Sequence, residues 1–288
     1  MIGIFDSGSG GLSVLREILR ILPKEKYVYY SDNANCPYGE KSVEFIRNRA
    51  REITRLLISK GAQIIVVACN TATAAAISVL REEFPVKFIG MEPAVKPAAL
   101  SSKTGVIGVL ATAGTLKASR YLNIKEMFGD GTKIAEHVGE GFVELVENGI
   151  LDGPEAEETV RKSVLPLVAA GADRIVLGCT HYPFLRKVIE RVAGPGVQVI
   201  DPAPAVARHL AEVMKQEGLL DHEYADVPAA AEPVTEGQTE AGQAAGEPEA
   251  AHPAAEIELI ASGPELPARR LLDTIISGHA GRQTATKS

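Results

Sequence analysis

The sequence lacks several features that would indicate a membrane, secreted or nucleic-acid-binding protein. It contains no Trp and only 5% aromatic residues, which disfavours stacking platforms for single-stranded nucleic acid. No apolar run approaches the roughly 20 residues that a membrane helix needs. The chain enters a strand-like run at Ile2, without a basic leader or a cleavable apolar segment. We therefore expect a cytoplasmic protein that binds neither membranes nor nucleic acid.

Cysteine is also scarce, and its three copies are not spaced for a disulfide framework or a zinc site. Cys36, Cys69 and Cys179 form an odd set, with no CxxC pair and no histidine spacing typical of zinc. We expect free thiols in a reducing compartment and no bound metal. For Cys36, an inert buried thiol and a functional one are equally good interpretations.

Basic residues are missing from one long stretch. Between Lys215 and Arg269 there is no Lys or Arg, whereas Asp and Glu occur 12 times, so the rest of the chain carries 30 basic and 25 acidic residues. This mildly basic remainder suits a small anionic substrate, although an ordinary solvated surface explains it equally well. Residues 222–255 are rich in Ala, Glu, Gly and Pro and lack apolar periodicity, which predicts a disordered acidic insertion.

Short apolar runs alternate with helical patterns along the rest of the chain. Runs such as "IGIF", "QIIVVA" and "RIVLGC" are nearly continuous in apolar residues, and the segments between them place apolar residues at i, i+3 and i+4. This alternation is typical of parallel sheets covered on both faces. We predict an α/β protein of two domains: residues 1–97 with 207–288, and residues 98–206. The run "EIELIASG" and the helix "PARRLLDTIIS" are expected to complete the first domain.

The two predicted domains look like a diverged internal repeat. "IGIFDSGSGGLSVLREI" and "IGVLATAGTLKASRYL" each contain a strand, a turn of small residues and a helix. Cys69 lies 67 positions after Ile2, and Cys179 lies 72 positions after Ile107. A pseudo-twofold pairing would bring the carboxyl ends of both sheets together, and ligands of open α/β sheets bind at those ends. We therefore predict an active site in the cleft between the domains.

Cys69 and Cys179 are the strongest catalytic candidates. Each follows a strand and precedes an expected helix, whose N-terminus favours a thiolate over a thiol. Asn70 or Thr71, and Thr180, are expected to cap these helices or to face the cleft. Two opposed thiols suit racemisation or epimerisation, in which one sulfur removes a proton from carbon and the other returns one to the opposite face. A single nucleophilic cysteine with a histidine accounts for only half of this symmetry.

Other polar residues near the strand ends are candidates for assisting roles. Asp6 and His181 are proton-transfer candidates, although helix capping and a structural histidine are the plainer interpretations. In "FDSGSGG", Ser7 and the N–H groups of the turn are suited to hold a carboxylate. The turn half-matches a dinucleotide fingerprint, with Asp32 at a plausible distance, but Ser13 stands where the third glycine belongs. "NCPYGEKS", residues 35–42, is either a plain turn or a wall of the cleft.

Five motifs in order resemble glutamate racemase of the aspartate/glutamate racemase superfamily. They are "FDSGSGGLSV", "CPYGEKS", "ACNTATA", "GVLATAGTL" and "GCTHYPF". The resemblance covers residues 2 to about 215 and implies cofactor-independent interconversion of L- and D-glutamate by a homodimer, supplying D-glutamate for bacterial peptidoglycan. "HYPF" after the second cysteine favours glutamate over aspartate racemases. The acidic insertion is not typical of the family.

The resemblance also implies roles for individual residues. Cys69 would handle the proton of the D-enantiomer and Cys179 that of the L-enantiomer, assisted by Asp6, His181 and Glu147. Its implied substrate contacts are Asp6, Ser7, Tyr38, Gly39, Asn70, Thr71, Thr115, Thr180 and His181.

Three alternatives remain open on the sequence. The first is a racemase or isomerase of a related acid such as aspartate. The second is a non-catalytic amino-acid-binding module, although such a module would be expected to have lost one cysteine. The third, a nicotinamide enzyme, has only the incomplete glycine fingerprint in its favour.

Overall fold

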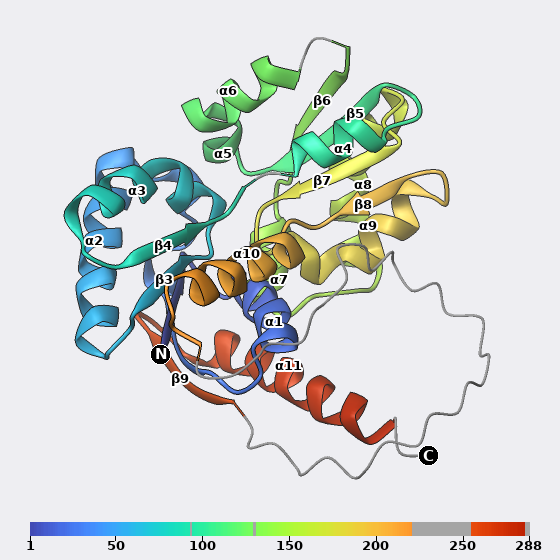
Figure 1. The fold of residues 1–288 in the computed structure, drawn as a ribbon. Helices are drawn as coiled ribbons and strands as arrows, with labels where there is room; N and C mark the ends of the chain where they lie inside the picture. Colours follow the sequence, from blue (N-terminus) through green and yellow to red (C-terminus); the bar gives the residue numbers. More distant parts are fainter. Residues whose placement is uncertain (93, 129–130, 221–254, 286–288) are drawn as a thin grey trace, which may run out of the picture.

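The computed structural model describes residues 1–92, 94–128, 131–220 and 255–285. The predicted acidic insertion at 222–255 lies outside the described residues, apart from Ala255. The described chain forms two parallel sheets in two lobes, which confirms the predicted α/β class (Figure 1). Within the described residues, no helix is long and apolar enough to cross a membrane.

The first sheet has the strand order β4-β3-β1-β2-β9, and all neighbouring strands are parallel. Its strands are β1 (Ile2–Asp6), β2 (Lys26–Ser31), β3 (Ile64–Val67), β4 (Lys87–Gly90) and β9 (Glu256–Ala261). Both faces of its central strands are covered, so these strands carry apolar residues at nearly every position. The helices of this lobe are α1 (Leu12–Ile21), α2 (Val43–Ser59), α3 (Asn70–Glu83), α10 (Ala203–Gln216) and α11 (Leu266–Ala285).

The second sheet has the strand order β6-β5-β7-β8, again all parallel. Its strands are β5 (Val106–Ala111), β6 (Lys133–Val138), β7 (Arg174–Gly178) and β8 (Gln198–Ile200). Its helices are α4 (Val95–Ser101), α5 (Ala113–Lys117), α6 (Ser119–Phe128), α7 (Phe142–Glu147), α8 (Pro154–Ala169) and α9 (Arg186–Ala193). Short 3₁₀ helices occur at η1 (Asn33–Asn35), η2 (Tyr38–Glu40) and η3 (Tyr182–Leu185).

The two sheets repeat the same topology, which confirms the predicted internal duplication. Strands β4-β3-β1-β2 in the first sheet correspond in order to β8-β7-β5-β6 in the second. Strand β3, which precedes Cys69, therefore corresponds to β7, which precedes Cys179. The repeat is not complete, because β9 adds a fifth strand beside β2 in the first sheet only. The exact domain boundaries stay a prediction.

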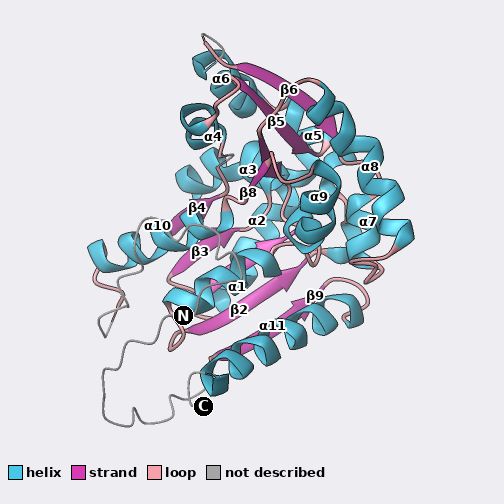
Figure 2. Cartoon of the chain, turned by 90° about the vertical axis from the view of Figure 1, so that its right-hand side faces the viewer, coloured by secondary structure: helices cyan, strands magenta, loops and turns pink. Residues whose placement is uncertain are grey.

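The hydrophobic core joins the two lobes. One buried cluster contains apolar side chains of β1, α1, α10 and α11 together with those of β7, α7, α8 and α9. Two smaller clusters fill the outer faces, one between the first sheet and helices α2 and α3, and one between the second sheet and helices α4 and α6. Helices α1 and α10 pack against each other near the centre, and α11 runs along β9 at the edge (Figures 1 and 2). Continuous packing across the lobes fixes how the strand ends face each other.

A buried ion pair anchors the loop that follows β2. The Asp32 carboxylate is fully buried and accepts hydrogen bonds from Arg49 Nε at 3.0 Å and Nη2 at 2.7 Å. It also accepts from the Tyr38 hydroxyl and the Asn35 amide. Burial raises the pKa of Asp32, but the bonds from Arg49, Tyr38 and Asn35 outweigh it and lower the pKa. Asp32 is thus bonded to internal partners, so it is not available to bind the ribose in the nicotinamide alternative.

We predict that Arg49→Met destabilises the fold by about 3–5 kcal/mol, because it leaves the buried Asp32 charge without its main partner. The loss is fully expressed above the unfolded-state pKa of about 3.9, and it vanishes as pH falls through the lowered folded-state pKa and Asp32 becomes protonated. Urea unfolding of both proteins between about pH 3 and 7 measures this difference.

Arg51→Met is the matched control. Arg51 lies on the same helix and pairs with Glu83 through two bonds of 2.8 Å, but both side chains are partly exposed. Exposed pairs of this kind contribute about 0–1 kcal/mol. Equal losses for the two variants would contradict the importance of burying Asp32.

Candidate active site

The carboxyl ends of β3 and β7 face one small pocket between the lobes. Cys69 follows β3 and Cys179 follows β7, and both thiols line this pocket. The pocket has a volume of about 10 Å³, enough for roughly one water molecule. Its lining residues are Ser7, Pro37, Tyr38, Gly39, Cys69, Asn70, Thr71, Thr112, Val143, Gly178, Cys179, Thr180 and His181.

Cys69 sits at the beginning of a helix and caps it with its own side chain. Its Sγ accepts a hydrogen bond from the Ala72 N–H at 3.4 Å, so Cys69 caps the helix, and Asn70 and Thr71 face the cleft, the second of the two expected alternatives. The Ser7 hydroxyl lies 3.7 Å from the same sulfur and 3.4 Å from the Asp6 carboxylate. These contacts form a chain from Asp6 through Ser7 to Cys69.

The helix N-terminus was expected to favour a thiolate at Cys69, but the surroundings of this sulfur in the ligand-free protein act against one. Burial raises the pKa of Cys69 well above its usual range, and the charge of Asp6 adds to this effect. The Ala72 and Ser7 hydrogen bonds act in the opposite direction but do not compensate. Burial likewise raises the pKa of Asp6, against the opposing effects of His181 and the Gly11 N–H. The Cys69 side of the pocket therefore favours protonated groups.

Cys179 has a different environment. It is followed by the 3₁₀ helix η3 rather than by an α-helix, so Thr180 does not cap a helix there. Instead, His181 Nδ1 lies 3.8 Å from Cys179 Sγ, while His181 Nε2 lies 2.7 Å from Glu147 Oε1. Burial lowers the pKa of His181, but bonding to Cys179, Cys36 and Glu147 raises it well above its usual value. A cationic imidazole beside Cys179 stabilises negative charge on that sulfur.

Glu147 connects the two lobes. Burial raises its pKa, but the bonds from His181 and Ser9 outweigh burial and lower it, so the group is a carboxylate. Its Oε1 accepts from the Ser9 N–H at 2.7 Å and its Oε2 from the Ser9 hydroxyl at 2.8 Å. The glycine-rich turn thus holds a carboxylate, as its N–H groups suggested, but the carboxylate belongs to Glu147.

The glycines of this turn are required by close approach to the second lobe. A Cβ atom at Gly8 would lie 2.4 Å from Glu147 Oε1, and one at Gly10 would lie 2.4 Å from His181 Nδ1. Neither position has room for a side chain while His181 and Glu147 keep their places. Glycine here is needed for contact between lobes as well as for the shape of the turn.

Polar side chains from both lobes complete the pocket wall. Tyr38 and Gly39 line it, so the 35–42 segment forms a wall of the cleft. Thr71 bonds to Thr112 and Thr115, each at 3.2 Å, which links the lobes. Asn70 is 5% exposed, yet neither its amide nitrogen nor its oxygen has a partner. An unpartnered buried amide in a pocket wall is suited to bind a polar ligand.

The structure brings most of the predicted site residues into one pocket. Ser7, Thr180 and His181 line it with the residues named above, whereas Asp6, Thr115 and Glu147 lie behind and contact lining residues. The remaining lining positions are Pro37, Thr112, Val143 and Gly178. Thr112 directly follows β5, and Ser7 directly follows the corresponding strand β1. The internal repeat therefore indicates Thr112 as a candidate site residue from the sequence. Val143 has no comparable signal in the sequence.

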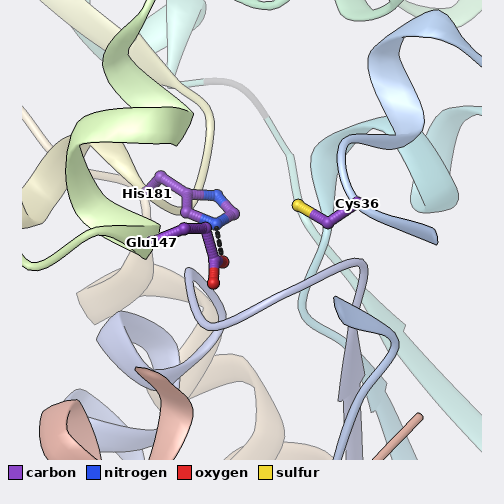
Figure 3. Close-up of side chains that lie close together, drawn as sticks. All are labelled: Cys36, Glu147 and His181. Carbon is purple, nitrogen blue, oxygen red and sulfur yellow. Dashed lines mark hydrogen bonds and ion pairs between the residues drawn. The ribbon is translucent and has the colours of Figure 1, made fainter. Parts of the chain in front are cut away.

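One cluster in this site has side chains suited to hold a metal. Cys36, Glu147 and His181 offer a sulfur, a carboxylate oxygen and a ring nitrogen that all lie within 4.8 Å of one another (Figure 3). These residues are far apart in the sequence, which explains why local spacing gave no sign of them.

Comparisons with known proteins agree with this geometry. The model of the Asp/Glu/Hydantoin racemase family matches residues 2–210. The glutamate racemase of Methylococcus capsulatus is 50% identical over 224 residues, which cover 78% of this chain and 83% of the other. That of Pseudomonas aeruginosa strain UCBPP-PA14 is 45% identical over 228 residues, which cover 79% of this chain and 86% of the other.

Solved structures show the same fold. A glutamate racemase isoform from Bacillus anthracis superposes with a TM-score of 0.77 at 29% identity, covering 96% of this chain and 94% of that one. The Escherichia coli glutamate racemase, solved with L-glutamate and an activator, gives a TM-score of 0.74 at 30% identity, with coverage of 96% and 93%. Fold, site and sequence similarity together define an amino-acid racemase. The chain belongs to the Asp/Glu/Hydantoin racemase family.

We predict that Cys69 reacts slowly with iodoacetamide at neutral pH, because its raised pKa leaves little thiolate. In the Cys36→Ala, Cys179→Ala background, the alkylation rate should still be rising above about pH 8.5, the pKa of an ordinary cysteine. Mass spectrometry of the labelled peptide measures this profile. A plateau below that pH would contradict the effect of burial on Cys69.

Proposed function

We propose that this protein is a glutamate racemase that uses two cysteines as acid and base and needs no cofactor. The observation that carries the proposal is the shared pocket of Cys69 and Cys179, reached from equivalent strands of two similar lobes. The relatives at 45–50% identity, which are named glutamate racemases, support glutamate as the substrate.

The environments of the two thiols support a division of labour in the resting enzyme. Cys69 and Asp6 both have raised pKa values, which favours a neutral thiol on that side. His181 and Glu147 form an ion pair beside Cys179, which favours a thiolate there. Two-base racemisation requires one thiol and one thiolate, and we assign the thiol to Cys69 and the thiolate to Cys179.

The reaction then proceeds from L-glutamate through a carbanion-like intermediate. The Cys179 thiolate takes the α-hydrogen as a proton, and the electron pair of the broken C–H bond moves onto Cα and the adjacent carboxylate. Cys69 donates its thiol proton to the opposite face of Cα, which gives D-glutamate and leaves a Cys69 thiolate. Hydrogen bonds to the α-carboxylate strengthen as charge builds there, so they stabilise the transition state more than the substrate.

Substrate recognition falls to the polar groups of the pocket wall. We assign the unpartnered Asn70 amide and the side chains of Ser7, Thr71 and Thr180 to hydrogen bonds with the carboxylates and the ammonium group. A space for one water molecule is too small for glutamate, so the lobes must separate for the substrate to enter. Closure over the substrate then excludes bulk water from the proton transfers.

We further propose that the product supplies D-glutamate for bacterial peptidoglycan, that the reaction takes place in the cytoplasm, and that the enzyme is a homodimer. The motif resemblance supports the first and last points. The free thiols of Cys36, Cys69 and Cys179 suit a reducing compartment. Sedimentation analysis of the full chain tests the dimer, and a single species of 30.5 kDa would exclude it.

We predict that Cys69→Ser and Cys179→Ser each lower racemisation by about 10³-fold or more, because a serine hydroxyl is a far weaker acid and base than a thiol. Circular dichroism follows inversion of each enantiomer, and NMR in D₂O follows exchange of the α-hydrogen. Full activity of either variant would refute the two-base mechanism.

The same assay separates the alternatives. A binding module would bind glutamate and show no α-hydrogen exchange in the unmodified protein. A racemase of a related acid would convert aspartate faster than glutamate in a substrate panel. Both outcomes would contradict the proposed activity.

We predict that Asn70→Ala raises KM for glutamate by about 10–100-fold, the effect of losing one or two hydrogen bonds to a charged ligand. Its free energy of unfolding should not fall, because the amide has no partner in the free protein. Steady-state kinetics and urea unfolding measure the two effects.

Thr73→Ala is the control for Asn70→Ala. Thr73 lies on the same helix, but its hydroxyl bonds to the Val67 carbonyl and the Met91 N–H, each at 3.0 Å. Its loss should therefore lower stability by about 1–3 kcal/mol and leave KM nearly unchanged. A lower free energy of unfolding with an unchanged KM in Asn70→Ala would show that Asn70 has a structural role.

A further inference from the structure

Three potential metal ligands from separate parts of the chain converge beside the pocket. Cys36 comes from the loop after β2, Glu147 from the end of α7, and His181 from the segment after β7. Their sulfur, oxygen and nitrogen atoms lie within 4.8 Å of one another. Figure 3 shows Cys36 on one side, facing His181 and Glu147 on the other.

The chemistry of this cluster matches one class of metal ion. Thiolate, imidazole and carboxylate are the three side-chain types that bind Zn²⁺, and three protein ligands with an open fourth position are typical of accessible zinc sites. Tetrahedral bonds of about 2.0–2.3 Å place ligand atoms roughly 3.3–3.7 Å apart, so small side-chain rotations bring this cluster to that spacing. Mg²⁺ and Ca²⁺ prefer oxygen ligands and fit poorly.

An ion can reach the cluster from solvent, and neighbouring residues hold its side chains in place. Cys36 and Glu147 are only partly buried, so an ion has a route to them, while His181 is 2% exposed. Gly8 lies against the cluster, and a Cβ atom there would come within 2.9 Å of Cys36 Sγ and 2.4 Å of Glu147 Oε1. The Ser9 hydroxyl holds the second carboxylate oxygen of Glu147, which orients the first toward His181. Outer hydrogen bonds of this kind orient metal ligands.

We propose that Cys36, Glu147 and His181 form a binding site for a thiophilic divalent cation, represented by Zn²⁺, and that occupation of this site inhibits the enzyme. The cation forms bonds to the Cys36 sulfur, a His181 ring nitrogen and a Glu147 oxygen, and any protons on the sulfur and that nitrogen pass to solvent. A water molecule completes the four ligands.

Inhibition follows from the groups that the cation occupies, and this part rests on the proposed racemase function. The short hydrogen bond between His181 and Glu147 is replaced by bonds to the metal. His181 and Glu147 are then metal ligands and no longer form the ion pair beside Cys179 that the proposed mechanism uses. The metal joins Cys36 of the first lobe to His181 and Glu147 of the second lobe. Glu147 also accepts a hydrogen bond from Ser9 of the first lobe, and the metal adds to this link, so the bound metal resists opening of the cleft.

Cys36→Ser is the decisive variant, because Cys36 is a proposed metal ligand but is not one of the two sulfurs that transfer protons in the proposed racemisation. Isothermal titration of the reduced full-length enzyme with ZnCl₂ should show one site, and Cys36→Ser should weaken it by at least about tenfold, the lower bound for lost outer-shell partners. Co²⁺ binding should give a near-ultraviolet thiolate-to-metal band that is absent in Cys36→Ser. Inhibition of Cys36→Ser by Zn²⁺ is measured relative to the metal-free rate of the same variant.

Cys69→Ser is the control that separates this site from the catalytic thiols. Cys69 is not among the three ligands, so the variant should retain the Zn²⁺ affinity and the Co²⁺ band although it cannot racemise glutamate. Zn²⁺ should inhibit the unmodified enzyme reversibly, with recovery on addition of EDTA, and should inhibit Cys36→Ser at least about tenfold less.

Two results would overturn the proposal. Equal Zn²⁺ affinity of Cys36→Ser and the unmodified enzyme would show that Cys36 is not a ligand. Loss of the site in Cys69→Ser would place the metal between the catalytic thiols instead. Both readouts are binding measurements, so they decide the site even if the protein racemises no glutamate.

Discussion

The carboxylate of Glu147 is the group on which the arrangement of the site depends. It belongs to the second lobe, yet it accepts the N–H and the hydroxyl of Ser9 from the first lobe, and it accepts a hydrogen bond from His181 at the same time. One carboxylate thus contacts both lobes and contributes, after Cys179 and Cys36, to the raised pKa of the imidazole beside Cys179. Gly8 and Gly10 allow the turn of the first lobe to lie against the second lobe, because a side chain at either position would collide with Glu147 or His181.

The sequence was informative wherever structure follows from local pattern. The nearly continuous apolar runs predicted parallel strands, because only a sheet covered on both faces requires apolar residues on both sides of a strand. The repeated Ile-Gly strands and the similar distances to Cys69 and Cys179 predicted the duplicated topology, which the strand orders confirm. Placement of both thiols in one cleft followed from that topology, since parallel strands present their carboxyl ends at a common edge.

The sequence was uninformative where contacts between distant segments decide the outcome. A thiolate at Cys69 was expected from its helix N-terminus, but burial and the nearby Asp6 dominate, and neither can be read locally. The turn at Ser7 was expected to hold a carboxylate, and it holds two from the protein itself: that of Asp6, through the Gly11 N–H, and that of Glu147, 138 residues after Ser9. Cys36 likewise gave no sign of the histidine and glutamate beside it.

The two lobes share one topology, but the surroundings of Cys69 and Cys179 differ, so the two sulfurs are not equivalent in the proposed reaction. Each passage from L to D under the proposed chemistry ends with the charge on the opposite sulfur from where it began. Cys69 must therefore regain a proton and Cys179 must lose one before the enzyme can convert a second molecule of the same enantiomer. The pocket between the two sulfurs has space for roughly one water molecule, so little water is available there to carry that proton while the lobes are together. Under the proposed chemistry, repeated turnover in one direction therefore requires proton exchange with solvent between successive substrate molecules, in addition to the chemistry at carbon.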